Sequence, residues 1–99
     1  MNVLFHRLAA KELVNQRAYY RQRVATLGDD FFLAVETAVK AILSEPHRIR
    51  AAVLGLSRIR VRRFPFNVLF HMDASTIRIY AITHAKRRPG YWRGRLSKD

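Results

Sequence analysis

The chain has 99 residues and is 49% hydrophobic, which fits one domain over residues 1–99 with a buried core of its own. It contains no cysteine, so disulfides and thiolate metal sites are excluded, and a reducing compartment is consistent with this composition. No apolar run is long enough to span a membrane and no complete signal peptide is recognisable, so we expect a soluble, cytoplasmic protein.

The positive charge is concentrated in the second half of the chain. In total, 19 Lys and Arg residues stand against 7 Asp and Glu residues, a formal net charge of +12. Residues 1–45 carry a net charge of +1 and residues 46–99 carry +11. Fifteen of the basic residues are Arg, whose planar fork suits bidentate contacts with phosphate or carboxylate groups. This distribution favours a nucleic acid or an acidic protein as partner over a basic face that serves solubility alone.

The first 45 residues predict one strand and two helices. Asn2–Phe5 is a short apolar stretch typical of a strand, and an approximate helical stripe covers residues 8–27. We expect Gly28 to end this helix as a C-terminal glycine, and one of the two aspartates that follow to cap a second helix. The second helix extends to Pro46, and its apolar stripe consists of Phe31, Phe32, Val35, Ala38, Val39, Ile42 and Leu43. Two antiparallel helices joined by a tight turn follow from this pattern.

The most basic stretch of the chain predicts a strand with one cationic face. Its residues alternate in the order Arg58, Ile59, Arg60, Val61, Arg62. Since successive side chains of a strand point to opposite faces, the three guanidiniums share one face and the two β-branched residues share the other. Arg63 has the parity of the β-branched residues, so we expect it either to flip outward at the following turn or to pair with a carboxylate.

Further strands are expected on either side of this stretch. Residues 51–54 predict a short strand before a turn at Gly55, and Pro65 predicts a turn or bulge because it has no N–H for a sheet. Residues 68–70 resume as a strand. Residues 76–83 predict the last strand, with Ile77, Ile79 and Ala81 on one face and Arg78, Tyr80 and Ile82 on the other. The fold class is therefore α+β, with two helices packed on one face of a twisted antiparallel β-sheet.

Several spaced motifs resemble the RelE/ParE toxin superfamily, in the order in which that family carries them. They are Glu12, Leu13, Ala18, Tyr19 and Tyr20 in the first helix, Gly28 and Phe31 between the helices, Pro46, the turn from Arg62 to Phe66, and the ending His84, Arg87, Pro89, Tyr91 and Trp92. The resemblance covers nearly the whole chain. It implies the same fold, namely an N-terminal strand followed by a two-helix antiparallel hairpin on an antiparallel sheet.

The resemblance also implies a function. Members are small toxins of type II toxin–antitoxin pairs, each bound by a cognate antitoxin that is usually encoded beside it. RelE-like members are ribosome-dependent endoribonucleases that cleave mRNA without a metal, whereas ParE-like members inhibit DNA gyrase and have no known hydrolytic site. A non-toxic, basic nucleic-acid-binding module remains a third class, which predicts salt-sensitive binding to naked DNA or RNA.

The residues favour the ParE-like branch. For a nuclease, the resemblance implies Arg60, Arg62, His84, Arg87 and Tyr91 as the catalytic candidates. The arginines would stabilise the charged transition state, and His84 or Tyr91 would supply a proton. Arg is too strongly basic to carry protons readily, and by ungapped matching Asn67 stands where RelE-like nucleases place a phosphate-binding Arg. The turn from Arg62 to Phe66 and the ending from Arg87 to Trp92 look more like those of ParE-like members. The resemblance therefore makes gyrase poisoning the leading hypothesis, and the mRNA endoribonuclease is the alternative.

The candidate target-binding residues lie on the cationic strand and near the C-terminus. They are Arg58, Arg60, Arg62, Arg87, Arg88, Tyr91, Trp92 and Arg95. We expect Arg87 and Trp92 to lie over or beside the arginine face of the strand, so that they form one continuous surface with it.

Some of these residues also have a structural interpretation. Tyr91 and Trp92 are expected either to cover an exposed edge of the core or to stack a base or anchor a partner. His84 is expected to fix the tail through a backbone hydrogen bond rather than to act as an acid. Tyr19 and Tyr20 are expected to serve packing. The four histidines show no metal-ligand spacing, so we expect neither a metal nor another cofactor.

Overall fold

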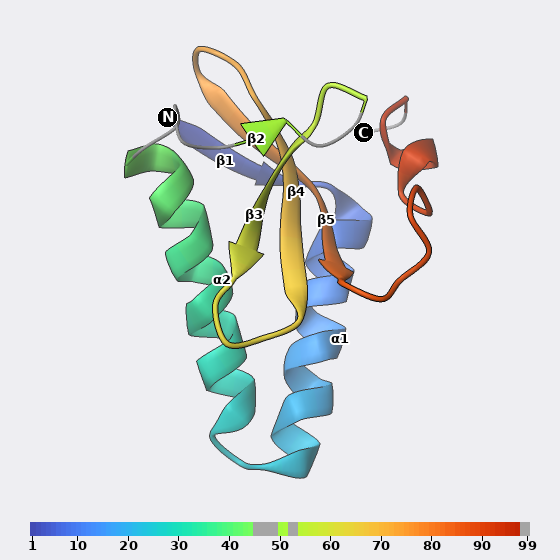
Figure 1. Ribbon diagram of the computed structural model, residues 1–99. Coiled ribbons are helices and arrows are strands. Elements are labelled where there is room, and N and C mark those ends of the chain that lie inside the picture. The colour runs from blue at the N-terminus through green and yellow to red at the C-terminus, as the bar shows by residue number, and fades with distance from the viewer. Residues whose placement is uncertain (45–49, 52–53, 98–99) are drawn as a thin grey trace.

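The computed structural model describes residues 1–44, 50–51 and 54–97, and these contain the expected sequence of one strand, two helices and further strands (Figure 1). The elements are β1 Asn2–Phe5, α1 Arg7–Arg23, α2 Leu27–Ser44, β2 Arg50–Ala51, β3 Ser57–Val61, β4 Phe66–Met72, β5 Thr76–His84 and a 3₁₀ turn at Arg93–Arg95. Within the described residues, no helix is both long and apolar enough to cross a membrane. The expected α+β fold is confirmed.

The strands form one sheet in the order β1-β5-β4-β3-β2. From β2 to β5 each strand pairs antiparallel with its neighbour along the chain. β1 instead joins the free edge of β5 in parallel, with Val3 opposite Ile77. The sheet is thus mixed rather than wholly antiparallel, because both helices and three strands separate β1 from β5 and supply the long connection that a parallel pair requires.

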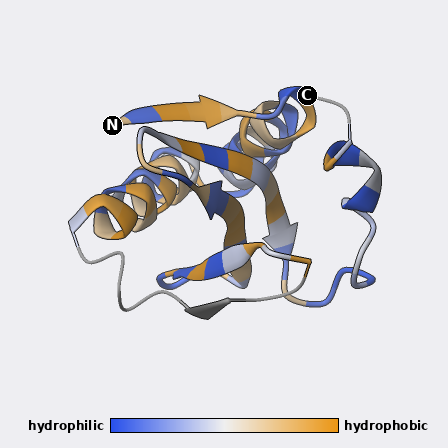
Figure 2. Ribbon diagram, turned by 90° about the horizontal axis from the view of Figure 1, so that it is seen from above, coloured by the Kyte–Doolittle hydropathy of each residue, from blue (hydrophilic) through white to orange (hydrophobic). Residues whose placement is uncertain are grey.

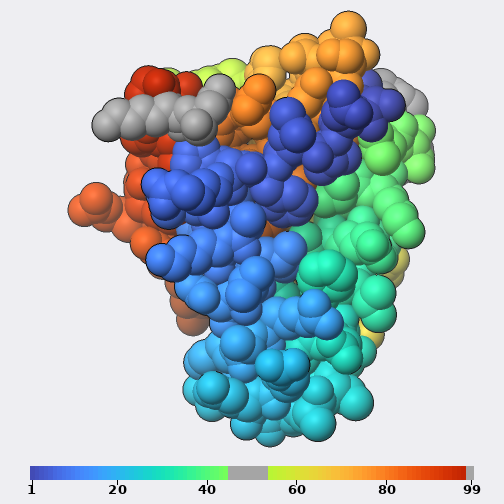
Figure 3. Space-filling model, turned by 180° about the vertical axis from the view of Figure 1, so that it is seen from behind, coloured from blue at the N-terminus to red at the C-terminus, as the bar shows by residue number. Residues whose placement is uncertain are grey.

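Both helices cover the same face of the sheet. They lie behind it in Figure 1 and fill much of the view from behind in Figure 3. The ribbon of α2 alternates between apolar and polar residues (Figure 2). The buried core on this face contains Phe31, Val35, Ala38 and Ile42 from α2 and Val61, Val68, Phe70, Ile77 and Ile79 from the strands. These four α2 residues belong to the predicted stripe, and Val39 of that stripe packs against the core, whereas Leu43 is 44% exposed.

Aromatic rings join the two helices to the β3–β4 turn. The rings of Phe31 and Phe64 lie 5.2 Å apart in an edge-to-face arrangement, and the Tyr20 ring lies 5.1 Å from that of Phe64. Such geometry contributes about 0.5–1.5 kcal/mol per pair beyond the burial of surface. Tyr20 therefore serves packing, as expected. Tyr19 is 46% exposed, and its hydroxyl oxygen accepts a hydrogen bond of 2.6 Å from Arg23.

Gly28 has a different role from the one expected. α1 ends at Arg23, and Gly28 lies in the first turn of α2. A Cβ atom at this position would lie 2.6 Å from the carbonyl oxygen of Arg17 and 2.9 Å from Cβ of Arg21. Glycine is therefore required because the two helices approach closely there, and its interpretation as a C-terminal glycine of the first helix is wrong.

A bulge in β5 breaks the expected alternation of the last strand. Leu69 pairs with Ala81 and Phe70 pairs with Ile79, so Tyr80 is an extra residue on β5. Ile79 packs in the core under the helices, whereas Tyr80 and Ala81 both belong to a second cluster. Beyond the bulge, Ile82 packs under the helices again, although the sequence pattern placed it with Tyr80.

The second cluster lies on the sheet face that the helices do not cover. Trp92 packs there against Leu56, Leu69, Tyr80 and Ala81, and Tyr91 and Leu96 pack at its margin. These contacts come from residues 85–97, which we call the C-terminal segment and which follows β5 (Figure 1). Of the described residues of the expected strand at 51–54, Ala51 is in a strand. Leu54 begins a turn, and residues 52–53 lie outside the described residues.

Candidate functional site

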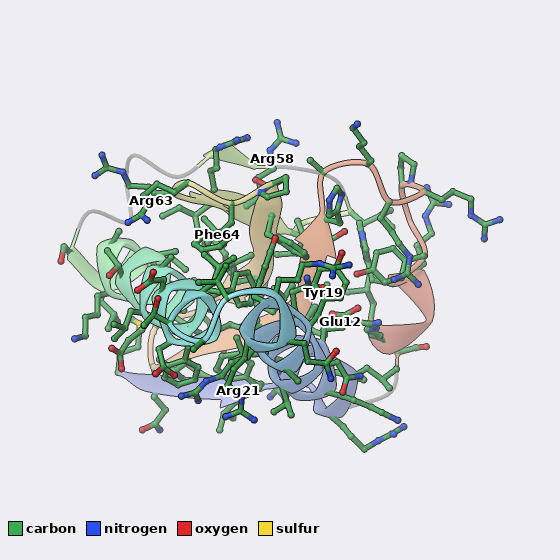
Figure 4. All side chains as sticks on the ribbon, turned by 90° about the horizontal axis from the view of Figure 1, so that it is seen from below. Glu12, Tyr19, Arg21, Arg58, Arg63 and Phe64 are labelled. Atoms are coloured by element: carbon green, nitrogen blue, oxygen red, sulfur yellow. The ribbon has the colours of Figure 1, made fainter. Side chains whose placement is uncertain are left out.

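The arginines of β3 lie on the sheet face turned away from the helices. Arg58 is opposite Leu69, a member of the second cluster, and Arg60 is opposite Asn67. Arg58 and Arg60 are exposed, while Val61 is buried under the helices. Figure 4 shows Arg58 directed away from both helices. The predicted alternation of a cationic and an apolar face is confirmed from Arg58 to Val61, whereas Arg62, expected on the same strand face, lies beyond the end of β3.

The β3–β4 turn adds two more exposed arginines. Arg62 and Arg63 begin this turn, and Arg63 has a φ of 71°, a left-handed conformation uncommon for a residue other than glycine. This conformation removes Arg63 from the alternation of β3, so its side chain is exposed rather than buried beside Ile59. Of the two expected outcomes, the flip at the turn is the one observed.

A groove runs between α2 and the edge of β3, with a volume of about 550 Å³. It is lined by Asp30, Leu33, Ala34, Thr37, Ala38 and Ala41 from α2 and by Ile59, Arg60, Arg62 and Arg63 from β3 and its turn. We call it the α2–β3 groove. Small and apolar side chains form most of its α2 side, and Leu33 is 54% exposed within it. No described residue forms an ion pair with the three arginines of its rim, so the groove suits a segment that carries apolar anchors and carboxylates.

Glu12 of α1 is the residue that holds the C-terminal segment. Its Oε1 accepts hydrogen bonds from the backbone N–H of Ile82, at 3.0 Å, and from Nη1 of Arg95, at 2.9 Å. Its Oε2 accepts hydrogen bonds from the Tyr91 hydroxyl, at 2.8 Å, and from Nη2 of Arg95, at 2.9 Å. Figure 4 shows Glu12 directed from α1 toward the C-terminal segment. Glu12 belongs to the family motif in the first helix, but no site role was expected for it.

Arg95 does not have the exposed position expected of a target-binding residue. Its side chain is 10% exposed, and besides binding Glu12 it donates a hydrogen bond of 2.9 Å to the carbonyl oxygen of Tyr80. Burial acts to lower the pKa of Arg95, but the hydrogen bonds and charge of Glu12 outweigh it and raise that pKa above its usual value. The guanidinium is therefore committed to internal contacts, because a carboxylate from α1 reaches it across the end of the sheet.

Tyr91 and Trp92 also have internal roles. Trp92 is 4% exposed and covers the second cluster, so of its two expected roles the structure shows the cover over the core. Burial raises the pKa of the Tyr91 phenol, and its hydrogen bond to Glu12 adds to that rise. The Tyr91 ring remains available on one side, where the guanidinium of Arg87 lies 3.8 Å from the ring centroid.

We had expected Arg87 to lie over or beside the arginine face of β3, but the structure places it elsewhere. Together with Tyr91 it lines a cavity of about 420 Å³, which is closed on the other side by His6, Arg7 and Leu8 at the start of α1. Trp92, by contrast, does lie over the expected sheet face. Because Arg87 stacks on a tyrosine that is fixed to α1, the expected continuous surface consists of two separate basic regions. Arg88 is exposed on the loop that precedes Tyr91.

His84 has the structural role expected of it. Its Nδ1 accepts a hydrogen bond of 3.0 Å from the backbone N–H of Lys86, and its ring lies 5.0 Å from that of Phe66. It lines a third hollow, beside Tyr19, Tyr20 and Arg23. The five nuclease candidates are thus distributed among the α2–β3 groove, this hollow and the cavity beside α1. Among the described residues, no group of three or more His, Asp or Glu side chains is arranged to hold a metal ion.

Comparisons with known proteins agree with this architecture. The family model described as "ParE toxin of type II toxin-antitoxin system, parDE" matches residues 3–89. A solved structure described as "Chromosomal ParDE TA system from P. aeruginosa" aligns with a TM-score of 0.51 and 22% sequence identity, over 85% of this chain and 95% of that one. No curated protein matches the sequence. Since the family model covers most of the chain, this protein belongs to the ParE toxin family of type II toxin–antitoxin systems.

Proposed function

We propose that this ParE-family toxin acts by poisoning DNA gyrase and is neutralised by a cognate antitoxin. The proposal that gyrase is the target rests on the separation of the nuclease candidates from one another. An mRNA-cleaving site needs its proton carriers and cations around one phosphate. Here His84 is hydrogen-bonded to the backbone beside Tyr19, Arg60 and Arg62 lie at the α2–β3 groove, and Arg87 lies beside α1. This arrangement favours a surface that binds a macromolecule over one that cleaves RNA.

The experiment that tests the gyrase target compares the two branches directly. Purified toxin should inhibit supercoiling by purified gyrase, and its expression without antitoxin should induce the DNA-damage response. Ribosome-bound mRNA should stay intact by primer extension. Cuts within translated codons, together with normal supercoiling, would replace gyrase poisoning with the RelE-like endoribonuclease activity.

The α2–β3 groove is the proposed antitoxin site. Its apolar side and three-arginine rim match an amphipathic, acidic segment, and the net charge of +11 in residues 46–99 would attract such a segment at long range. The similar P. aeruginosa structure is described as a ParDE toxin–antitoxin system, which supports an antitoxin as the partner of this chain. We expect the antitoxin segment to be partly disordered when free and to fold as it binds.

A single exposed position tests the groove. The Leu33→Glu variant introduces a negative charge into the apolar side of the groove at little cost to the fold, because Leu33 is 54% exposed. It should weaken the complex with the antitoxin, co-expressed from the adjacent reading frame, by about tenfold or more. The matched control is Val14→Glu on α1, where the side chain is 65% exposed and lies outside the groove. Equal binding by the two variants would show that the antitoxin does not use this groove.

A further inference from the structure

Glu12 accepts four hydrogen bonds from groups that are distant in the sequence. The donors are the N–H of Ile82, the hydroxyl of Tyr91 and two nitrogens of Arg95, and they lie 70 to 83 positions further along the chain. Its side chain is only 19% exposed. A carboxylate in this position makes charge-assisted hydrogen bonds, which are about twice as strong as neutral ones.

Glu12 and Arg95 also provide hydrogen-bond partners for backbone groups at the edge of β5. β1 pairs with β5 from Thr76 to Ile79, so among the described residues no strand lies beside the edge of β5 beyond Ile79. On this stretch the N–H of Ile82 binds Glu12 and the carbonyl oxygen of Tyr80 binds Arg95. Backbone groups that would otherwise lack partners are thus satisfied by one ion pair. The pair joins α1, β5 and the C-terminal segment at a single point.

From this point, contacts lead outward to an exposed cation. The Tyr91 hydroxyl donates to Glu12, and the Tyr91 ring supports the guanidinium of Arg87 at 3.8 Å. The guanidinium of Arg95 lies 5.1 Å from the same ring. Two cations at one ring repel each other, and the charge of Glu12 offsets that repulsion. The Tyr91 ring thus favours one position of the Arg87 guanidinium, and Glu12 holds that ring through the Tyr91 hydroxyl.

We propose that Glu12 is a positioning residue, which fixes the C-terminal segment and, through Tyr91, sets Arg87 in place for contact with the target. This inference rests on the proposed function insofar as the target is gyrase. The attachment of the segment to α1 through Glu12 is independent of what the target is. Glu12 itself has no direct contact with the target in this proposal.

The Glu12→Gln variant tests the proposal, with Glu36→Gln as the matched control. Gln preserves the shape of the side chain but removes the charge and replaces one acceptor by a donor. Glu36 is an exposed carboxylate on α2 for which the structure shows no hydrogen bond or ion pair with a described residue, and it does not line the α2–β3 groove. The two substitutions therefore make the same change in charge.

The full-length chain offers a direct signal for the position of the segment, because Trp92 is its only tryptophan. In Glu12→Gln the Trp92 emission should shift to longer wavelength, and trypsin should cut after Arg93 and Arg95 about tenfold faster, since charge-assisted hydrogen bonds have been lost. Gyrase inhibition should fall by about tenfold or more. Binding of the antitoxin and the far-UV circular dichroism spectrum should not change, because the α2–β3 groove lies elsewhere. Glu36→Gln should match the wild type in every measurement.

Two results would overturn the proposal. One is unchanged Trp92 emission and tryptic cleavage in Glu12→Gln, because the segment would then be held without Glu12. The other is full gyrase inhibition by a Glu12→Gln protein whose segment has loosened, because the position of Arg87 would then not matter. If the wild type does not inhibit gyrase, the proposed target is wrong. Emission, cleavage and growth arrest in cells without antitoxin then decide the role of Glu12.

A milder variant keeps the test decisive if Glu12→Gln fails to fold. Tyr91→Phe retains the ring under Arg87 and the ion pair between Glu12 and Arg95, and it removes only the hydroxyl hydrogen bond. It should give a smaller red shift and a smaller loss of inhibition, in the same direction. A Tyr91→Phe protein identical to the wild type in both measurements would contradict the route from Glu12 through Tyr91 to Arg87.

Discussion

Arg60 and Arg95 both belong to the strongly basic half of the chain, yet the fold uses them in opposite ways. Arg95 has a side chain that is 10% exposed, and it is fixed by Glu12 and by the carbonyl oxygen of Tyr80. Arg60 is exposed at the α2–β3 groove and forms no ion pair with a described residue. The difference arises because a carboxylate from α1 reaches one guanidinium and not the other.

This comparison shows that a count of charges does not identify a binding surface. A guanidinium with a buried partner has already exchanged its water for protein, and a new anion would have to break that contact. A guanidinium without a partner can accept an anion at little cost. Exposed arginines without such a partner, on β3 and its turn, are therefore the better candidates for contacts with a target or an antitoxin.

The largest effect on stability is expected where an arginine holds the C-terminal segment. Arg95→Ala leaves Glu12 half-buried without its counter-ion, and the free energy of unfolding should fall by about 3 kcal/mol, as for other broken buried pairs. The control is Arg93→Ala in the same segment, where the side chain is exposed. Urea denaturation measures both variants. A midpoint for Arg95→Ala equal to that of Arg93→Ala would mean that the ion pair does not stabilise the fold.

A smaller loss of stability is expected at the neighbour of Arg60 on β3. Ile59 packs partly buried against the helix-side core, whereas Arg60 points the other way. Ile59→Ala should lower the free energy of unfolding by about 2 kcal/mol, near the lower limit for such changes because the site is incompletely buried. Thermal melting followed by circular dichroism measures the loss. A melting temperature equal to that of the wild type would contradict the assignment of faces on β3.

Periodicity predicted much of the fold, because the relevant signals are local. The stripe of α2 and the alternation of β3 each arise within one element, and both proved correct except at their ends, Leu43 and Arg62. Two features depended on distant parts of the chain and were missed. Glycine is required at position 28 because the backbone of Arg17, in the other helix, lies too close for a Cβ atom. The bulge at Tyr80 depends on the register of β5 with β4. A local pattern contains no information about either.

The candidate site was less predictable than the fold, for the same reason. The prediction that Arg58 and Arg60 share one exposed face is correct, and His84 makes the backbone hydrogen bond expected of it. Arg95 was expected to bind the target with Arg58 and Arg60, and Glu12 was expected to have no site role. Only the contacts between residues 83 positions apart reveal that Glu12 and Arg95 form one unit.

The pH dependence of stability should reflect the environment of Tyr91. Burial and the hydrogen bond to Glu12 raise the pKa of its phenol in the folded protein above the value of about 10 in an unfolded chain. The folded state thus retains the phenol proton of Tyr91 more strongly than the unfolded chain does. The contribution of Tyr91 to the free energy of unfolding is therefore complete below about pH 10 and is lost as the pH rises through the pKa of Tyr91 in the folded protein. The pKa of Tyr20 is also raised, mainly by burial.

We therefore expect the melting temperature to fall as the pH is raised from about 9 to about 11. Tyr91→Phe should show a shallower fall, although not a flat profile, because Tyr20 still contributes. Glu36→Gln is the control, since Glu36 is exposed and the substitution leaves every tyrosine in place. A profile for Tyr91→Phe as steep as that of the wild type would mean that the phenol proton is held no more tightly in the folded state.

The smallest effect on stability is expected at Arg60, where the effect on function should be large. Arg60→Ala should change the free energy of unfolding by no more than about 0.5 kcal/mol, because the side chain is exposed and has no described ion-pair partner. It should nevertheless reduce growth arrest in cells that lack the antitoxin. The matched control is Arg21→Ala on α1, which removes the same charge from an exposed helix position and leaves the Cβ that faces Gly28. If the two variants lose toxicity equally, then the total charge of the protein matters and the position of the arginine does not. If Arg60→Ala loses toxicity and Arg21→Ala does not, then the exposed arginine face of β3 takes part in the contact with the target.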